Sequence, residues 1–258
     1  MHAPAAPPID PALLLSAYRA GIFPMADARD DPEVFWVEPR MRAILPLDGF
    51  RLSASLARTV RRDRFAVTCN AAFDAVIEAC AAARPGRDET WISGKIAASY
   101  RELHRLGFAH SIECWREGEL GAELVGGLYG VGFDRVFCGE SMFSLERDVS
   151  KVALAWLVAA LRRGGVELLD CQFMTDHLAS LGAVEIDQAD YLARLGDAQA
   201  GVGVGLGVAE AVGEGVGPGE AAALGLPAGF AALLGDAALA GVASSPGKRI
   251  AQSLTHTS

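Results

Sequence analysis

The chain has 258 residues, with 23 lysines and arginines, 32 aspartates and glutamates, and a formal net charge of -9. Hydrophobic residues make up 51% of it, which is enough to bury a sizeable core and excludes a wholly disordered chain. The acidic balance excludes a protein that coats nucleic acid with a uniformly basic surface, but it permits a local basic patch.

Cysteine usage and hydropathy point to a reducing compartment. The five cysteines form no CxxC pair, and their odd number argues against a zinc ribbon and against a secreted disulfide framework. The first residues lack a basic segment followed by a long apolar one, so we expect no signal peptide. No run of about 18 apolar residues occurs, so we expect no membrane span. A cytoplasmic location, without a metal, is therefore predicted.

A basic stretch occupies the first quarter of the chain. Residues 40–64 contain seven arginines and two acidic residues. Within this stretch residues 52–64 are predicted to be helical, which brings Arg58, Arg61 and Arg62 near one helix face. Such a face is either a solvated helix surface or a surface that contacts phosphates.

Strand-like and helix-like segments then alternate. Helices are predicted at 71–83, 94–106, 149–163 and 177–181, and strands at 65–68, 111–115, 124–132, 135–138 and 167–172. This mixture predicts an α/β or α+β domain built on one sheet. Residues 196–258 differ, because they contain GVGVGLGV and GEGVGPGE and carry only Lys248 and Arg249 as bases. Ordering so many glycines is entropically costly, so a flexible low-complexity extension is predicted.

Three short patterns suggest chemistry but are incomplete. Residues 139–143 begin like the nucleophile elbow GxSxG but end in Phe143, so they support a serine hydrolase only weakly. Cys138 or Cys171 could pair with His110 or His177 as a thiol nucleophile, although buried strand cysteines are more common. Residues 127–132 resemble half of a pyrophosphate-binding loop, but glycines in adjacent strands more often permit close packing.

The predicted strand at 167–172 is more informative. Asp170 and Gln172 lie two residues apart, so on a strand they are expected to project from the same face, while Leu169 and Cys171 point the other way into apolar packing. A carboxylate beside an amide could orient an amine nucleophile, or it could belong to a polar edge strand.

A series of ordered motifs resembles one family. They are YRAGIFP at 18–24, ILPL at 44–47, TWI at 90–92, YRELHRLGFAHSIECW at 100–115, LVGGLYGV at 124–131, CGESMFS at 138–144, SKVAL at 150–154, DCQ at 170–172 and HLASLGA at 177–183. In this order they resemble the leucyl/phenylalanyl-tRNA–protein transferases, and the resemblance covers about residues 11–195.

The resemblance implies a fold and an activity. The fold would be a small N-terminal domain at 1–50 and an acetyltransferase-like (GNAT-like) domain at 51–195, before the glycine-rich tail at 196–258. The activity would be transfer of Leu or Phe, and possibly Met, from charged tRNA to the N-terminal amine of proteins beginning with Arg or Lys, which marks them for N-end-rule degradation. Neither CoA nor another cofactor would be used, and we expect a monomer.

The resemblance also implies roles for individual residues. Gln172 would hold the amine and relay its proton, Asp170 would orient Gln172, and Glu140 would position the amine or the aminoacyl end. The tRNA's own terminal ribose hydroxyl could relay the proton instead. The remaining roles are a pocket for the Leu or Phe side chain (Met142 and Phe143, with Leu169 as a further candidate), a stacking surface for the terminal adenosine (Trp91), and phosphate contacts (Arg58, Arg61 and Arg62).

Some positions depart from the family pattern. Met25 stands where many members carry an aromatic residue, so either one stacking surface is absent or Trp36 supplies it. Ala54 replaces an arginine that is frequent in the family. Two other functions stay open at this point: a small-molecule N-acyltransferase that binds acyl-CoA at 127–132, and a non-catalytic RNA-binding module.

Overall fold

The computed structural model describes residues 7–83, 90–119, 121–200, 225–239 and 245–255. Its N-terminal part consists of helix α1 (Pro11–Arg19) and a two-stranded antiparallel sheet of β1 (Phe23–Met25) and β2 (Phe35–Val37). Asp10 begins α1 because its side chain accepts from the backbone N–H of Leu13, and proline at the first helical position needs no such partner.

Within the described residues, seven strands form the main sheet in the order β4-β5-β6-β7-β8-β3-β9. Only the pairing between β7 and β8 is parallel. The strands are β3 (Met41–Ile44), β4 (Ala66–Cys69), β5 (Ala109–Gly118), β6 (Gly121–Phe133), β7 (Val136–Ser144), β8 (Leu168–Gln172) and β9 (Val184–Asp187). The expected mixed α/β architecture with a small N-terminal unit is confirmed, and the main sheet takes one strand, β3, from the first fifty residues.

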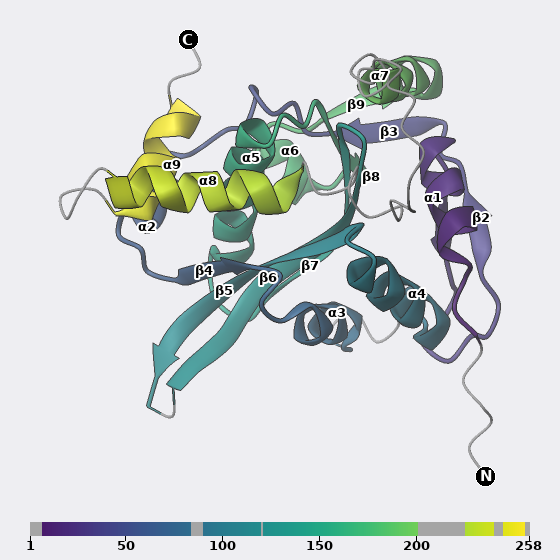
Figure 1. Cartoon of the computed structure of the whole chain (residues 1–258), viewed down its shortest axis with the longest axis horizontal. Helices are drawn as coiled ribbons and strands as arrows, with labels where there is room; N and C mark the ends of the chain where they lie inside the picture. The colour runs from purple at the N-terminus through teal and green to yellow at the C-terminus, as the bar shows by residue number, and fades with distance from the viewer. Residues whose placement is uncertain (1–6, 84–89, 120, 201–224, 240–244, 256–258) are drawn as a thin grey trace, which may run out of the picture.

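Helices cover both faces of the sheet (Figure 1). One face packs against α2 (Ala54–Arg61), α5 (Val149–Arg163) and α6 (Asp176–Ser180). The other packs against α1, α3 (Phe73–Ala81), α4 (Gly94–Arg105) and α7 (Gln188–Ala200). Helix α5 is apolar on nearly all sides, with a continuous buried run from Val152 to Leu161, so it must be enclosed by other elements.

Two helices near the C-terminus complete this enclosure. Helix α8 (Leu226–Leu239) packs along α5, and α9 (Pro246–Thr255) packs against α2 and α5. Phe230 of α8 contacts Trp156 of α5, with ring centroids 5.5 Å apart. The expectation of a flexible extension therefore does not extend to these helices, because their apolar residues belong to the main core. The glycine-rich repeats at 201–224 lie outside the described residues.

Glycine has two different roles in α8. At Gly229 an added Cβ would lie 1.9 Å from the carbonyl oxygen of Ala160 in α5, so the two helices approach each other more closely than any side chain permits. At Gly235 an added Cβ would meet no atom within 4 Å.

These surroundings predict opposite effects of the same substitution. Gly229→Ala should lower the free energy of unfolding by about 1–3 kcal/mol, because it overpacks the α5–α8 contact. Gly235→Ala should raise it by about 0.5–1 kcal/mol, because alanine is the better helix former. Urea unfolding of both variants measures the difference, and equal effects would show that α8 does not pack on α5 in solution.

Candidate active site

The candidate site lies where β7 and β8 separate. These strands pair from Val136 and Leu168 to Cys138 and Asp170, and beyond that point they diverge. A cavity of about 420 Å³ occupies the gap. Its wall is largely apolar and includes Leu128, Met142, Leu154, Leu157, Leu169 and Leu178. Its polar members include Glu140, Gln172, Ser141, Thr175 and His177.

Glu140 reaches this cavity because it is the extra residue of a β-bulge. Tyr129 pairs with Ser141 and Gly130 pairs with Gly139, so Glu140 has no partner on β6. A bulge bends its strand and redirects a side chain. Glycine is required opposite it, since a Cβ at Gly130 would lie 2.3 Å from the carbonyl oxygen of Cys138.

The Glu140 carboxylate accepts hydrogen bonds from three side chains among the described residues. The hydroxyl of Tyr18 donates to Oε1 (2.8 Å), that of Tyr100 donates to Oε2 (2.9 Å), and Nε2 of Gln172 donates to Oε1 (3.1 Å). Burial raises the pKa of Glu140 to about 7, and the two tyrosine hydroxyls act against this shift. Glu140 is therefore poised between its protonated and ionised forms near neutral pH.

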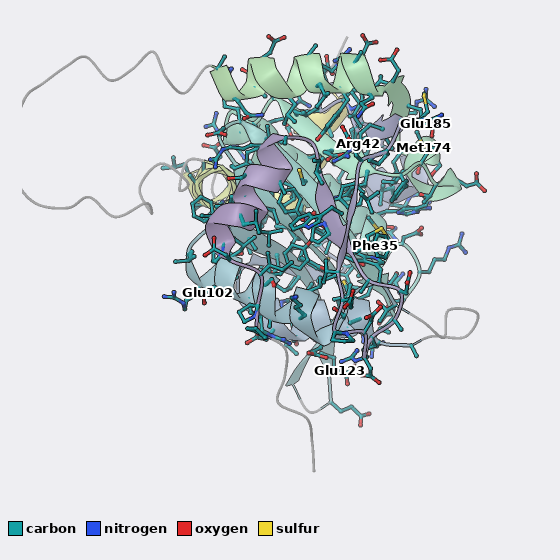
Figure 2. The ribbon with its side chains drawn as sticks, turned by 90° about the vertical axis from the view of Figure 1, so that its right-hand side faces the viewer. Phe35, Arg42, Glu102, Glu123, Met174 and Glu185 are labelled. Atoms are coloured by element: carbon teal, nitrogen blue, oxygen red, sulfur yellow. The ribbon has the colours of Figure 1, made fainter. Side chains whose placement is uncertain are left out.

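Asp170 is fully buried beneath the site instead of lining the cavity. It accepts from Nε (2.9 Å) and Nη2 (2.6 Å) of Arg42 and from the hydroxyl of Tyr191 (3.1 Å). Its Oδ1 also accepts the backbone N–H of Gln172 at 2.8 Å. Figure 2 places Arg42 just below α7, the helix that carries Tyr191.

The expected pairing of Asp170 and Gln172 at the site is seen only in part, because Gln172 lines the cavity whereas Asp170 does not. Gln172 has a positive φ of 55°, so regular strand geometry ends there and its side chain turns toward Glu140. Leu169 and Cys171 pack in the core that contains α5, as expected, and both also line the cavity.

Other predicted residues divide between the cavity and the rest of the molecule. Trp91 and Met142 line it, and Trp91 also lines an adjoining cavity of about 130 Å³ with Met25, Glu140 and Gln172. Phe143 does not line either cavity; its side chain is 1% exposed and packs in the core on the other side of the sheet. It follows Met142 on a regular strand, so it points to the opposite face.

The remaining predicted residues lie on the surface. Trp36, on β2, is 42% exposed and is absent from both cavity walls, whereas Met25 is part of the smaller one. Arg58, Arg61 and Arg62 are exposed on α2 or at its end, outside the cavity.

Four residues of the site were missed from the sequence: Tyr18, Arg42, Tyr100 and Tyr191. Tyr18 and Tyr100 are the first residues of two family-like motifs, which was a usable signal. In the sequence Arg42 is simply one arginine of the basic stretch, although in the structure it is only 2% exposed. No pattern in the sequence indicates Tyr191.

The incomplete motifs do not form the sites they suggested. Residues 139–143 lie within β7, so Ser141 is not on a strand-to-helix turn. Residues 127–132 lie within β6, where a Cβ at Gly127 would be 2.7 Å from the carbonyl oxygen of Ile112, which confirms the packing interpretation. Burial raises the pKa of the Cys138 and Cys171 thiols, so neither is set up as a thiolate.

The described residues contain no cluster of three or more His, Cys, Asp or Glu side chains arranged to hold a metal ion. Among the helices described, none is both long enough and apolar enough to cross a membrane.

Most of the chain is similar in sequence to one family of known proteins. A sequence model of the leucyl/phenylalanyl-tRNA protein transferases matches residues 44–196, and a model of the N-terminal domain of the same family matches residues 8–40. The chain belongs to this family. The family name implies aminoacyl transfer from tRNA to protein, so the chain is an enzyme of the aminoacyltransferase class.

Individual family members agree with this assignment. A leucyl/phenylalanyl-tRNA–protein transferase of Novosphingobium aromaticivorans is 67% identical over 97% of both chains. One from Rhizorhabdus wittichii is 61% identical over 78% of this chain and 79% of its own. One from Rhodopseudomonas palustris strain HaA2 is 55% identical over 77% of this chain and 87% of its own.

The raised pKa of Glu140 predicts how stability depends on pH. A carboxyl whose pKa rises from 4.5 in the unfolded chain to about 7 in the fold stabilises the protein below pH 4.5. That contribution is lost as the pH rises to about 7. It amounts to about 3 kcal/mol, since one pKa unit is worth about 1.4 kcal/mol.

Replacing Glu140 should remove this dependence. Glu140→Gln is expected to flatten the free energy of unfolding between about pH 4.5 and 7, as measured by chemical denaturation at several pH values. Glu185→Gln, at an exposed position, is the matched control and should keep the wild-type profile. An unchanged profile in Glu140→Gln would mean that the carboxyl titrates normally.

Proposed function

We propose that this enzyme transfers Leu or Phe, with Met as a further candidate, from charged tRNA to the N-terminal α-amino group of proteins beginning with Arg or Lys. Acceptors would thereby be marked for N-end-rule degradation, and the enzyme would act in the cytoplasm as a monomer without a cofactor. The observation that carries the proposal is the apolar cavity whose wall contains the Glu140 carboxyl and the Gln172 amide.

The cavity supports an apolar aminoacyl group. Much of its wall consists of Leu and Met side chains from β6, β7, β8, α5 and α6, and its volume of about 420 Å³ is ample for a Leu or Phe side chain. Burying such a side chain gains about 1.5–3 kcal/mol, without any polar partner. The ester end of the aminoacyl group would then lie at the polar part of the wall, beside Glu140 and Gln172.

The chemistry requires one proton to move. The nitrogen of the acceptor amine attacks the ester carbonyl, the N–C bond forms, the ester C–O bond breaks, and the ribose oxygen leaves as a hydroxyl. A terminal amine has a pKa of about 7.7–8.0, so roughly a tenth is neutral at pH 7. Glu140, with a pKa of about 7, would accept the proton that the amine releases and return it to the ribose oxygen. Holding the two reactants together supplies much of the remaining rate gain.

Gln172 and Asp170 have different roles in this scheme. Gln172 touches the reacting groups: its Nε2 holds Glu140, and its Oε1 would accept from the amine. Asp170 is a positioning residue that acts through the backbone N–H of Gln172 and is neutralised by Arg42.

This division predicts separable defects. Gln172→Ala should lower kcat about 100-fold, the usual loss for one oriented polar group, with little change in stability. Asp170→Asn should lower the free energy of unfolding by about 3–5 kcal/mol, because it leaves the Arg42 charge buried and unpaired. Radiolabelled Leu-tRNA with an acceptor protein beginning with Arg measures transfer, and urea unfolding measures stability.

The assay includes two controls. An acceptor that begins with Gly and a reaction treated with RNase should both give no transfer. Absence of transfer by the folded wild-type enzyme with intact charged tRNA would overturn the proposed function, and acyl-CoA would then be the donor to test. Full activity of Gln172→Ala would refute the role given to its amide.

Two of the tryptophans, Trp91 and Trp36, provide a further contrast. Trp91 contributes to both cavities, so it is placed to stack on the terminal adenosine, whereas Trp36 lies outside both. Stacking is worth about 1–3 kcal/mol per base, so Trp91→Ala should raise the KM for Leu-tRNA by about 5- to 150-fold. Trp36→Ala should change it less than about twofold. Steady-state kinetics with varied Leu-tRNA distinguish the two, and the reverse order would transfer the stacking role to Trp36.

A further inference from the structure

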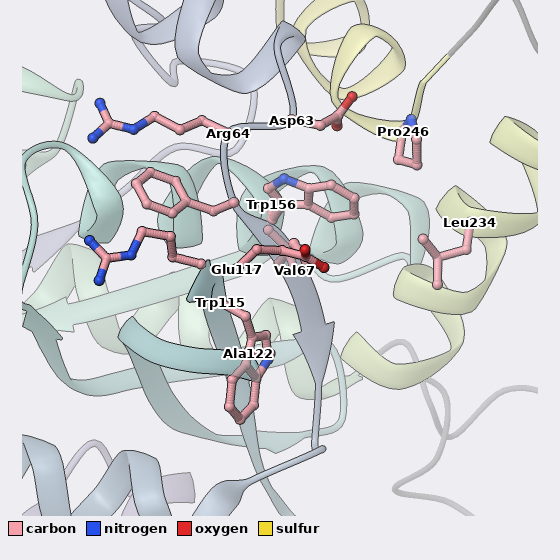
Figure 3. Close-up of a pocket in the computed structure, with 12 residues that line it drawn as sticks. Asp63, Arg64, Val67, Trp115, Glu117, Ala122, Trp156, Leu234 and Pro246 are labelled. Atoms are coloured by element: carbon pink, nitrogen blue, oxygen red, sulfur yellow. The ribbon is translucent and has the colours of Figure 1, made fainter. Parts of the chain in front are cut away.

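Helix α9 begins at the end of α2, although almost two hundred residues separate them. The backbone N–H of Gly247 donates to Oδ1 of Asp63 at 2.8 Å. A Cβ at Gly247 would lie 1.9 Å from the carbonyl oxygen of Val60, so the two helix ends touch through backbone atoms. In Figure 3 Asp63 and Pro246 lie near each other above a cavity of about 580 Å³ that also includes Trp156 and Leu234.

This junction concentrates positive charge. Lys248 and Arg249 directly follow Gly247 in sequence, and Arg61 and Arg62 directly precede Asp63. Residues 51–64 and 245–255 together hold seven basic residues and one acid, Asp63, which is engaged with Gly247. We call the surface formed by the exposed Arg58, Arg61, Arg62 and Lys248, together with the half-buried Arg249, the α2–α9 basic face.

Arginines elsewhere on the surface are often neutralised by carboxylates. Arg29 pairs with Glu78, Arg105 with Glu102, Arg116 with Glu123 and Arg163 with Asp236. Within the described part of the chain, no carboxylate oxygen lies within ion-pairing distance of Arg58, Arg61, Arg62 or Arg249. A protein with a net charge of -9 repels a polyanion, so unneutralised arginines gathered in one place give a local attraction for phosphates.

The face is also close to the candidate site. Helix α5 contributes Leu154 and Leu157 to the cavity wall and packs against both α2 and α9. Helix α5 therefore links the cavity wall to the two helices that carry the basic face. A tRNA whose 3′ end enters the cavity can place phosphates of its body on this face.

We propose that α9 is part of the tRNA-binding surface, with Lys248 and Arg249 contacting phosphates away from the aminoacylated end. This inference rests on the proposed function, because the ligand is the same charged tRNA. It extends that function to a helix beyond residue 196, where the family match ends.

The test measures RNA binding without catalysis. Full-length Lys248→Gln/Arg249→Gln is compared with wild type for binding of uncharged tRNA between 50 and 200 mM KCl. Each lost phosphate contact reduces the slope of log K against log salt by about 0.7–0.9, so we expect a slope shallower by 1–2 and binding about 3- to 10-fold weaker. At saturating Leu-tRNA kcat should stay unchanged while KM rises, and Arg249→Lys should keep the wild-type slope.

The matched control has the same change in net charge at a different place. Arg40→Gln/Arg194→Gln removes two exposed arginines near β3 and α7 and should leave the salt slope unchanged. An equal loss of tRNA affinity in both double variants would show that only the net charge of the protein matters, and it would overturn the inference. An unchanged salt slope in Lys248→Gln/Arg249→Gln would also overturn the inference, because it would show that these two residues do not contact tRNA phosphates. Absence of transfer by wild type refutes the proposed function separately.

Discussion

The buried ion pair between Arg42 and Asp170 is the interaction on which the candidate site depends. It joins β3 to β8, and Arg42 also donates to the carbonyl of Gly21 (2.9 Å) and lies against the rings of Phe23 and Tyr191. Removing both charges from water costs several kcal/mol each, and this dense set of hydrogen bonds offsets the cost. The pair therefore holds the end of β8 in one position.

That fixed strand end determines how the polar groups of the cavity are arranged. Asp170 holds the backbone N–H of Gln172, which turns in the left-handed conformation and donates to Glu140. The bulge in β7 brings Glu140 to the same place, and tyrosines from α1 and α4 complete its hydrogen bonds. Since Tyr18 belongs to the N-terminal unit, the carboxyl acquires its full set of partners only when that unit packs on the main sheet.

Helices α8 and α9 support the cavity indirectly, because they cover the helix that forms part of its wall, α5. Helix α5 forms part of the cavity wall and is too apolar to face water, so α8 covers it through a glycine contact that no larger residue could make. Helix α9 then joins the end of α2. Covering α5 and assembling the α2–α9 basic face are thus two consequences of one packing arrangement.

The sequence by itself determined the class of fold, most of the strands and helices, the family, and two polar residues of the cavity wall, Glu140 and Gln172. These features depend on local periodicity and on contiguous motifs, both of which can be read along the chain. Four features were decided only by the tertiary structure: the burial of Asp170 with Arg42, the positive φ that redirects Gln172, the exclusion of Phe143 from the cavity, and the ordering of α8. Each depends on contacts between segments far apart in the chain, and the energy of a buried charge or a glycine contact exists only once those segments have met.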